Sequence, residues 1–176
     1  MTTMAEAGRT RVEVPDFDSW VAARGPALLR LAYVLTGNGT DAEDVVQDAL
    51  SRALPRWTRI STVDDPDAYV RRMVVNAHVS RWRKVRRREV PVEVVHDRPA
   101  PPGMGAEYRD RLWRACRALP TDQRTAVVLR FYEDLDYAEI AALTGVREGS
   151  VRSRVSRGIA AMRHELGADE MGDGDE

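Results

Sequence analysis

Residues 144–166 read TGVREGSVRSRVSRGIAAMRHEL, and their pattern is that of an amphipathic helix. At 100° per residue, five apolar residues fall within a sector of about 80°, which predicts a buried stripe: Val151, Val155, Ile159, Met162 and Leu166. The opposite side carries small or polar residues flanked by arginines: Gly149, Ser150, Ser153, Arg157 and Ala160, with Arg152 and Arg154. Small outward residues let a helix approach DNA closely, while arginines bind phosphates and guanine edges. The stretch predicts a DNA-reading helix, and a plain amphipathic surface helix is the alternative.

The residues before this helix predict a helix-turn-helix. YAEIAALTGV, residues 137–146, has the pattern of a short helix followed by a turn at Gly145. DYAE at 136–139 is a capping box, in which the first and last residues satisfy each other's backbone amides. Two further helical patterns, 106–118 and 122–132, lie on either side of Pro120 and Thr121.

Three helices are predicted in the amino-terminal half. The first begins at Asp16 and is stopped by GNG at 37–39. TDAE at 40–43 predicts a second capping box, with Thr40 as the cap of a helix that runs to Pro55. DDPD at 64–67 predicts the third start, with Asp65 as the cap and Pro66 in the first helical position.

The helical segments fall into two groups separated by EVPVEVVHDRPAPPGMG, residues 89–105. Four prolines and two glycines leave no helical period there, which favours a flexible linker. The predicted class is therefore all-α, with two small helical domains at 16–88 and 106–166. Residues 1–15 and the acidic stretch 167–176 are expected to be disordered. An alternative for the acidic stretch is that it folds over a basic surface and weakens DNA binding.

The charges of the 176-residue chain are segregated, although the net charge is only −1. Residues 71–90 hold eight basic and one acidic side chain, and residues 147–163 hold five and one. Residues 41–48 hold four acids, and residues 165–176 hold six, with no base in either segment. Of the 27 basic residues only Lys84 is a lysine, which suggests a GC-rich genome. Basic segments of this density favour a nucleic-acid partner.

Other classes of protein lack support in the sequence. No apolar run is long enough for a membrane span and the first residues lack a signal-peptide segment, so we expect a cytoplasmic protein. Cys116 is the only cysteine and is expected to be an apolar helix residue. The three histidines are scattered, so we expect no metal and no cofactor.

Residues 41–54 predict a helix with one apolar and one acidic face. The apolar face is complete: Ala42, Val45, Val46, Ala49, Leu50, Ala53 and Leu54. The opposite face carries Asp41, Asp44, Gln47, Asp48 and Ser51. One interpretation is a solvated surface whose acids favour the helix amino terminus. The other is a docking face for a basic partner, because the middle of this stripe has no cation at i+4. A metal site is disfavoured because no histidine or second acidic helix faces the stripe.

Residues 68–88, AYVRRMVVNAHVSRWRKVRRR, predict a basic helix. Its apolar residues are expected on one buried side: Tyr69, Val70, Met73, Val74 and Ala77. The cations, with Trp57 and Trp82 as stacking surfaces, favour nucleic acid. Asn76 interrupts the apolar run, and on sequence alone a buried, hydrogen-bonded amide and a functional amide are equally supported.

Together these segments resemble the extracytoplasmic-function (ECF) group of bacterial sigma factors. The carboxy-terminal likeness runs through LPTDQR, LRFYEDL, EIA and GSVRSRVSRG within residues 112–163. AEDVVQDAL resembles the family's polymerase-binding helix, and DPDAYVRRMVVNAHVSRWR resembles its promoter-recognition helix. The resemblance implies a sigma factor that binds core RNA polymerase, recognises promoter DNA, opens it and starts transcription at a restricted set of genes.

The resemblance also implies roles for individual residues. It places Asp41, Asp44, Gln47 and Asp48 on the clamp helices of the polymerase β′ subunit, with the β flap as a further contact. It places a flipped base of the minus-ten element against Asn76 and the loop from residue 56 to 65, which contains Arg56, Trp57 and Arg59. The strand backbone would be held by Arg71, Arg72, Arg81, Arg83 and Lys84. The minus-thirty-five element would be read by Ser150, Arg152, Ser153, Arg154 and Arg157, with Arg147 as a phosphate contact.

Two other classes of protein compete with this interpretation. A helix-turn-helix regulator that acts without joining polymerase would explain residues 106–166 but leaves the acidic stripe and Asn76 without a role. A recombinase or nuclease would need a nucleophile or a metal site, and Ser51, Ser61 and Ser80 lie in no such arrangement. We therefore expect no enzymatic activity. An anti-sigma factor is a further partner that the resemblance implies.

Overall fold

The computed structural model describes residues 15–87 and 107–172 of the chain. Every regular element in these ranges is helical, which confirms the all-α class. The amino-terminal unit contains α1 (Phe17–Thr36), α2 (Gly39–Ala53), the short 3₁₀ helix η1 (Leu54–Arg56), α3 (Trp57–Ile60) and α4 (Pro66–Arg87). The carboxy-terminal unit contains α5 (Glu107–Ala118), α6 (Thr121–Phe131), α7 (Tyr137–Thr144) and α8 (Glu148–Gly172). The predicted linker at 89–105 and residues 1–14 lie outside the described residues.

Local hydrogen bonds explain where most helices begin and end. The Ser19 amide donates to Asp16 at the start of α1, and Gly37, with φ of 80°, ends that helix. The Ala68 amide donates to the Asp65 carboxylate at 2.9 Å, which confirms the predicted start of α4. Asp136 and Glu139 form the predicted capping box of α7.

Two predicted helix ends are wrong. The cap of α2 is Asn38 rather than Thr40, because the extended backbone of Asn38 lets its side chain accept from the Asp41 amide at 2.8 Å. Helix α8 continues past its predicted end at Leu166 to Gly172, into the stretch predicted to be disordered. A single glycine at position 167 weakens a helix but does not end it.

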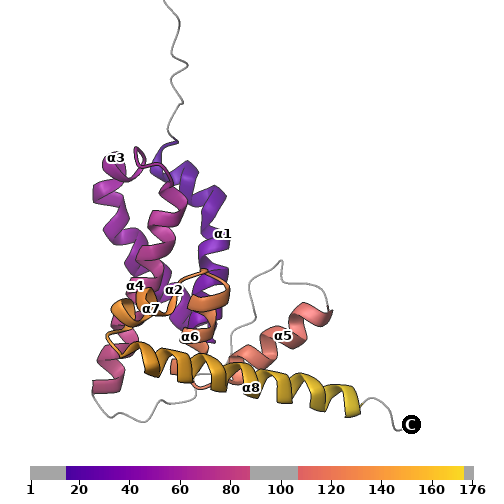
Figure 1. Ribbon diagram of the computed structural model, residues 1–176. Coiled ribbons are helices and arrows are strands. Elements are labelled where there is room, and N and C mark those ends of the chain that lie inside the picture. The colour runs from indigo at the N-terminus through magenta and orange to yellow at the C-terminus, as the bar shows by residue number, and fades with distance from the viewer. Residues whose placement is uncertain (1–14, 88–106, 173–176) are drawn as a thin grey trace, which may run out of the picture.

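Helices α1, α2 and α4 stand side by side in the amino-terminal unit, as Figure 1 shows. Their facing sides are apolar, and Leu35, Ala42, Val70 and Val74 are completely buried. Two residues predicted to be buried are exposed. Leu54 is 55% exposed because α2 ends at Ala53 and the chain turns into η1, and Tyr69 is 41% exposed on the outer side of α4.

Helix α8 crosses beneath α6 and α7 and is the longest element of the carboxy-terminal unit (Figure 1). Val151, Val155 and Met162 of its predicted stripe are buried, and Ile159 and Leu166 pack against the same core. The predicted inward face of this helix is therefore confirmed. Among the described residues, no helix has both the length and the apolar character needed to span a membrane.

The two helical units are in contact with each other. Helix α1 packs against α5 and α6, and α4 packs against α7. The buried apolar residues of both units belong to one continuous cluster, in which the Tyr33 and Trp113 rings lie 5.3 Å apart. The units described by the sequence as separate domains therefore share an interface in this structure.

Gly158 of α8 marks the closest approach of α8 to α6, because a β-carbon there would lie 2.7 Å from Val127 Cγ2. We predict that Gly158→Ala lowers the free energy of unfolding by about 1–3 kcal/mol, through overpacking. Gly149→Ala is the matched control, since a β-carbon at that position would meet nothing within 4 Å. Urea unfolding measures both variants, and equal stabilities would contradict the predicted close approach.

Candidate nucleic-acid and polymerase interfaces

The acidic stripe of α2 lies at the surface but is partly paired. Arg81 of α4 donates to both Asp41 and Asp44 at 3.0 Å, and Arg52 pairs with Asp48 at 3.0 Å. The prediction that the stripe has no cation at i+4 is therefore wrong for Asp48, whose partner Arg52 follows it by four residues on the same helix. Asp41 and Asp44 receive their cation from α4, a helix distant in the sequence. Such exposed pairs contribute at most about 1 kcal/mol each, so a more basic partner can displace them.

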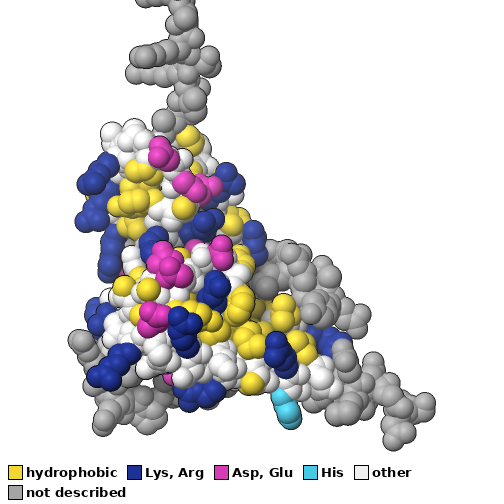
Figure 2. Space-filling model, viewed as in Figure 1, with side chains coloured by type: hydrophobic (Ala, Val, Ile, Leu, Met, Phe, Trp, Pro, Cys, Tyr) yellow, Lys and Arg dark blue, Asp and Glu magenta, His cyan; other side chains and the backbone are white. Residues whose placement is uncertain are grey.

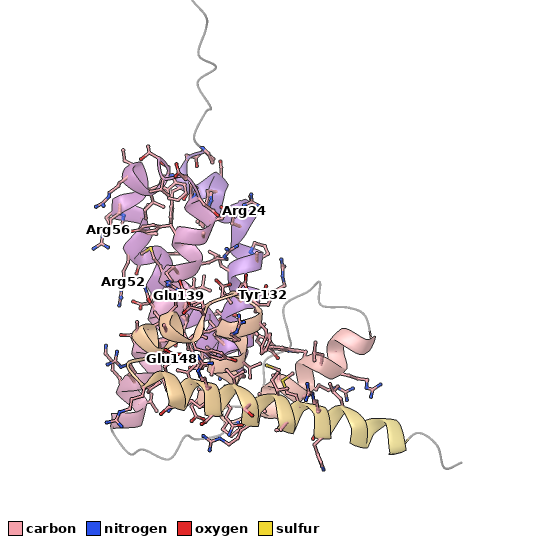
Figure 3. The ribbon with its side chains drawn as sticks, viewed as in Figure 1. Arg24, Arg52, Arg56, Tyr132, Glu139 and Glu148 are labelled. Carbon is pink, nitrogen blue, oxygen red and sulfur yellow. The ribbon has the colours of Figure 1, made fainter. Side chains whose placement is uncertain are left out.

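Gln47 and Asp44 remain exposed on this stripe. Arg52, which pairs with Asp48, points away from the body of the unit on the same side as Arg56 (Figure 3). The stripe therefore keeps an accessible polar surface that carries more acids than cations. An exposed polar surface of this kind is open to a basic partner.

The outer face of α4 carries an amide, an aromatic ring and several cations. Asn76 is exposed, so the alternative of a buried amide is wrong. Tyr69 and Arg72 lie at spacings of seven and four residues before Asn76, which places all three on one exposed face. Tyr69 was not predicted as a functional residue, although an aromatic at i−7 from Asn76 was a readable signal. Lys84 is exposed near the end of the same helix.

The loop from residue 56 to 65 contains α3 and a turn. Arg56 and Arg59 are exposed, as a strand-contacting role requires. Trp57 is only half-exposed, because its ring packs against Phe17 and Trp20 at centroid distances of 5.4 and 5.1 Å. Its indole N–H donates to the Pro15 carbonyl at 3.1 Å. Trp57 thus joins the loop to the start of α1, which leaves less of its ring for stacking on a base.

The predicted reading face of α8 is exposed. Ser150, Ser153 and Arg157 point to solvent, and Ser153, Arg157, Arg152 and Ser156 line one surface depression. Ser156 was missed from the sequence, although it follows Ser153 by three residues on the same face. The polar lining offers both hydroxyl groups and guanidinium groups to a groove of DNA.

Neighbouring residues hold Arg152 in place. Its guanidinium is paired with Glu148 one turn earlier and lies 4.3 Å from the centre of the Tyr137 ring. Glu148 is labelled at the start of α8 in Figure 3, next to α7. Arg147 is exposed just before the helix, where its carbonyl accepts from the Ser150 and Val151 amides. Figure 2 shows basic and acidic side chains interspersed around α7 and the start of α8.

Arg154 is placed differently from the other predicted reading residues. Its side chain is only 12% exposed, lies 3.3 Å from Asp122 and packs over the Trp82 ring. Arg83 is exposed, and its guanidinium lies close to Gly145 in the helix-turn-helix turn, where a β-carbon would lie 3.0 Å from Arg83 Nη2. These two arginines, together with Arg71, which lies 3.8 Å from Glu133, contact the opposite helical unit.

Two buried titratable groups lie near the junction of the units. His78 Nε2 and Thr125 Oγ1 are joined by a hydrogen bond of 2.9 Å, and burial, together with the Arg124 charge, lowers the pKa of His78 to about 4. Asp41 acts in the opposite direction on His78. Cys116 is buried, as expected of an apolar helix residue, and this burial raises the pKa of its thiol to about 11.

A helix-turn-helix with an exposed serine and arginine face, preceded by a helical unit with its own exposed cations, defines a DNA-binding protein with two contact surfaces. Comparison with known families refines this class. The family described as Sigma-70 region 2 matches residues 20–88, and the one described as Sigma-70, region 4 matches residues 109–162.

Similar proteins agree with these matches. The RNA polymerase sigma-E factor of Streptomyces coelicolor is 36% identical over 161 residues, which cover 90% of each chain. The RNA polymerase sigma factor SigV of Bacillus subtilis is 30% identical over 149 residues, covering 81% of this chain and 86% of that protein. The solved structure of the sigma factor RpoE of Bartonella quintana, in complex with the anti-sigma factor NepR, has a TM-score of 0.59 at 30% identity. That likeness covers 88% of this chain and 98% of RpoE.

The chain therefore belongs to the sigma-70 family, within its extracytoplasmic-function group. It is a sigma factor, which confirms the prediction made from its motifs and favours it over a regulator that acts without polymerase. The acidic helix and the Asn76 helix, which that alternative left without a role, both lie within the matched region 2.

The buried His78 predicts a pH-dependent stability. Its pKa is about 4 in the folded protein and 6.5 when free, so its contribution is complete above 6.5 and is lost as the pH falls toward 4. Between about pH 7.5 and about pH 5, this one group should cost the wild type about 2 kcal/mol of unfolding free energy. Urea unfolding of His78→Gln at the same two pH values should show a loss smaller by this amount. An identical loss in both proteins would contradict a neutral, buried His78.

Proposed function

We propose that this sigma factor docks on core RNA polymerase through the acidic stripe of α2, holds the minus-ten strand on α4 and reads the minus-thirty-five element with α8. The observation that carries the proposal is the exposed face of α8, where serines and arginines line one depression beyond a helix-turn-helix turn. The phosphodiester chemistry belongs to the polymerase, and we assign no catalytic step to this chain. In this proposal the protein acts on chromosomal DNA in the cytoplasm.

The acidic stripe supports docking on a basic helix pair, such as the clamp helices of the β′ subunit. Asp44, Gln47 and Asp48 follow one another along one face of α2, and complementary charge steers such encounters and fixes their register. Docking would displace Arg81, which now pairs with Asp41 and Asp44. The freed guanidinium would then join the cations of α4 that hold the DNA strand. Polymerase binding and strand binding are coupled in this scheme through one side chain.

The outer face of α4 supports single-strand binding. Asn76 offers a hydrogen-bonding amide, Tyr69 offers a ring on which a base can stack, and Arg72 is a cation beside both. Arg56 and Arg59 stand on the neighbouring loop. A base that leaves the duplex loses its stacking neighbours and the hydrogen bonds of its base pair. The Tyr69 ring and the Asn76 amide would replace these two interactions.

The exposed face of α8 supports reading of the major groove. Arg152 is held by Glu148 and Tyr137, so little of its side-chain freedom is lost when it binds a base edge. Ser150, Ser153 and Ser156 leave room for close approach of the helix backbone. Arg147 precedes the helix, at a point where a phosphate would also face the backbone amides of the first turn.

An anti-sigma factor is proposed as a further partner. The solved structure of RpoE from Bartonella quintana holds that sigma factor with the anti-sigma factor NepR. By similarity, this chain would be held inactive by a protein of that class until a signal releases it. Co-purification from the native cell followed by mass spectrometry would identify such a partner.

Reversing two charges of the acidic stripe tests the docking proposal. We predict that Asp44→Arg combined with Asp48→Arg weakens binding to purified core RNA polymerase at least tenfold, because two attractions become repulsions. Asp18→Arg combined with Asp110→Arg is a control with the same charge change at exposed acids elsewhere. Fluorescence anisotropy without DNA measures both variants, and an unimpaired stripe variant would show that the stripe is only a solvated surface.

Removing an arginine from the reading face of α8 tests promoter recognition. We predict that Arg157→Ala weakens promoter-specific run-off transcription from genomic fragments about tenfold, since a base or phosphate contact is worth about 1–3 kcal/mol. Arg163→Ala, an exposed arginine farther along α8, should leave transcription almost unchanged. Equal effects of the two substitutions would show a general charge effect instead of a reading face. Failure of the wild type to start any specific transcript would contradict the proposed function as a whole.

A further inference from the structure

The guanidinium of Arg152 is held by two side chains, one from its own helix and one from α7. Its Nη2 donates to the Glu148 carboxylate one turn earlier in α8. Its Cζ lies 4.3 Å from the centre of the Tyr137 ring, which is within the range of a cation–π contact. The Arg152 side chain nevertheless remains 58% exposed. The guanidinium is therefore held at the surface, where it stays accessible to DNA.

The position of Tyr137 is fixed by the start of α7. Tyr137 is the first residue of this helix and lies inside the capping box that Asp136 and Glu139 form at 2.8 and 2.9 Å. Its ring is half-buried against the core, and the Arg130 guanidinium lies 5.5 Å from the ring centre. Helices α7 and α8 lie against each other, and Figure 3 labels Glu139 on the first and Glu148 on the second. The first helix of the helix-turn-helix thus supplies a well-held ring to the second.

Other arginines of α8 are held in different ways. Arg157 Nε donates to the Ser153 carbonyl at 3.2 Å, which ties it to the backbone of its own helix. Arg154 is only 12% exposed and lies against Asp122. Arg152 differs from both because it combines an exposed guanidinium with side-chain contacts from two helices.

A held guanidinium suits a base edge better than a phosphate. Guanine presents two acceptors, O6 and N7, and an arginine binds both only when its planar fork is correctly oriented. Phosphates occur at every step of DNA, so an arginine that binds them carries no sequence information. The Glu148 carboxylate also repels phosphates, because like charges disfavour each other, whereas a base edge is uncharged. Tyr137 and Glu148 therefore favour a base edge over the DNA backbone as the partner of Arg152.

We propose that Tyr137 and Glu148 are positioning residues that aim Arg152 at a guanine of the minus-thirty-five element. Part of the base specificity is then set by α7, outside the helix that enters the groove. The aiming at guanine rests on the proposed function, since it requires α8 to read promoter DNA. The restriction of the Arg152 side chain does not require DNA and is measured on the free protein.

NMR relaxation of arginine Nε–H groups in the full chain tests the positioning. We expect a higher order parameter for Arg152 than for Arg163, an exposed arginine farther along α8. Tyr137→Leu, which keeps an apolar side chain but removes the ring, should lower the Arg152 value toward that of Arg163, and Tyr137→Phe should restore it. Tyr132→Leu is the matched control, because Tyr132 is an exposed tyrosine of the same unit. A wild type in which Arg152 is as disordered as Arg163 would overturn the positioning.

Run-off transcription with core polymerase tests the specificity, on promoters randomised across the minus-thirty-five element and with the transcripts sequenced. Arg152→Ala should abolish a preference for guanine at one position. Tyr137→Leu and Glu148→Gln should each reduce the preference at that same position about three- to tenfold, as expected when a flexible side chain must be ordered on binding. Glu165→Gln, a change at an exposed acid of the same helix, should leave all preferences as in the wild type.

The pattern over the promoter positions separates positioning from a structural role. A helix-turn-helix that Tyr137→Leu merely destabilises would lose preference at every position alike, and this result would overturn the proposal. An Arg152→Ala variant that keeps every preference would overturn it as well. A wild type that starts no specific transcript from the library would contradict the proposed function, whereas an ordered Arg152 side chain in the free protein would still stand.

Discussion

The guanidinium of Arg124 is the interaction on which the arrangement of this protein depends. It is a buried cation that donates to backbone carbonyls at the ends of α1 and α5. Burial of an uncompensated charge would be strongly unfavourable, so this residue requires both helix ends in place. Helix ends in turn carry the unpaired carbonyls that a guanidinium can bind. One side chain thereby fixes the start of α6 against its own unit and against the other.

Surface arginines of this chain also have more than one partner. Arginines of this chain serve both as ligands of its own acids and as proposed ligands of DNA, and Arg81 is the clearest example because it pairs with two aspartates of α2. Exposed pairs of this kind are weak, so they hold the cations in place without preventing exchange for a polyanion or a basic protein. A nearly neutral chain can in this way carry strongly charged working surfaces. The acids proposed to meet polymerase are among the groups that bring the total charge close to zero.

Much of the fold was readable from local patterns. The capping box at Asp136, the proline start of α4 and the apolar stripe of α8 each depend on residues within a few positions of one another, and each was predicted correctly. The wrong predictions concern positions where more than one local conformation or hydrogen bond is available to the chain. Asn38 takes the capping role from Thr40 because its backbone is extended, and Leu54 is exposed because η1 turns the chain. Tyr69 was missed as a site candidate because the apolar pattern of residues 68–88 predicts it on the buried side, and Ser156 was not among the residues predicted for the outward face of α8.

The sequence by itself determined the helical class, the order of the two units, the helix-turn-helix and the membership of the sigma-70 family, because these follow from short-range periodicity and from motifs of fixed spacing. Only the tertiary structure decided that Arg81 pairs with the acidic stripe, that Arg154 turns away from the reading face, and that Arg124 and Arg117 bind the end of α1. The partners in these contacts are tens of residues apart in the sequence. Nothing in the periodicity of a helix specifies which distant carbonyl or carboxylate its arginines will meet, because that choice is made by the packing of the helices against one another.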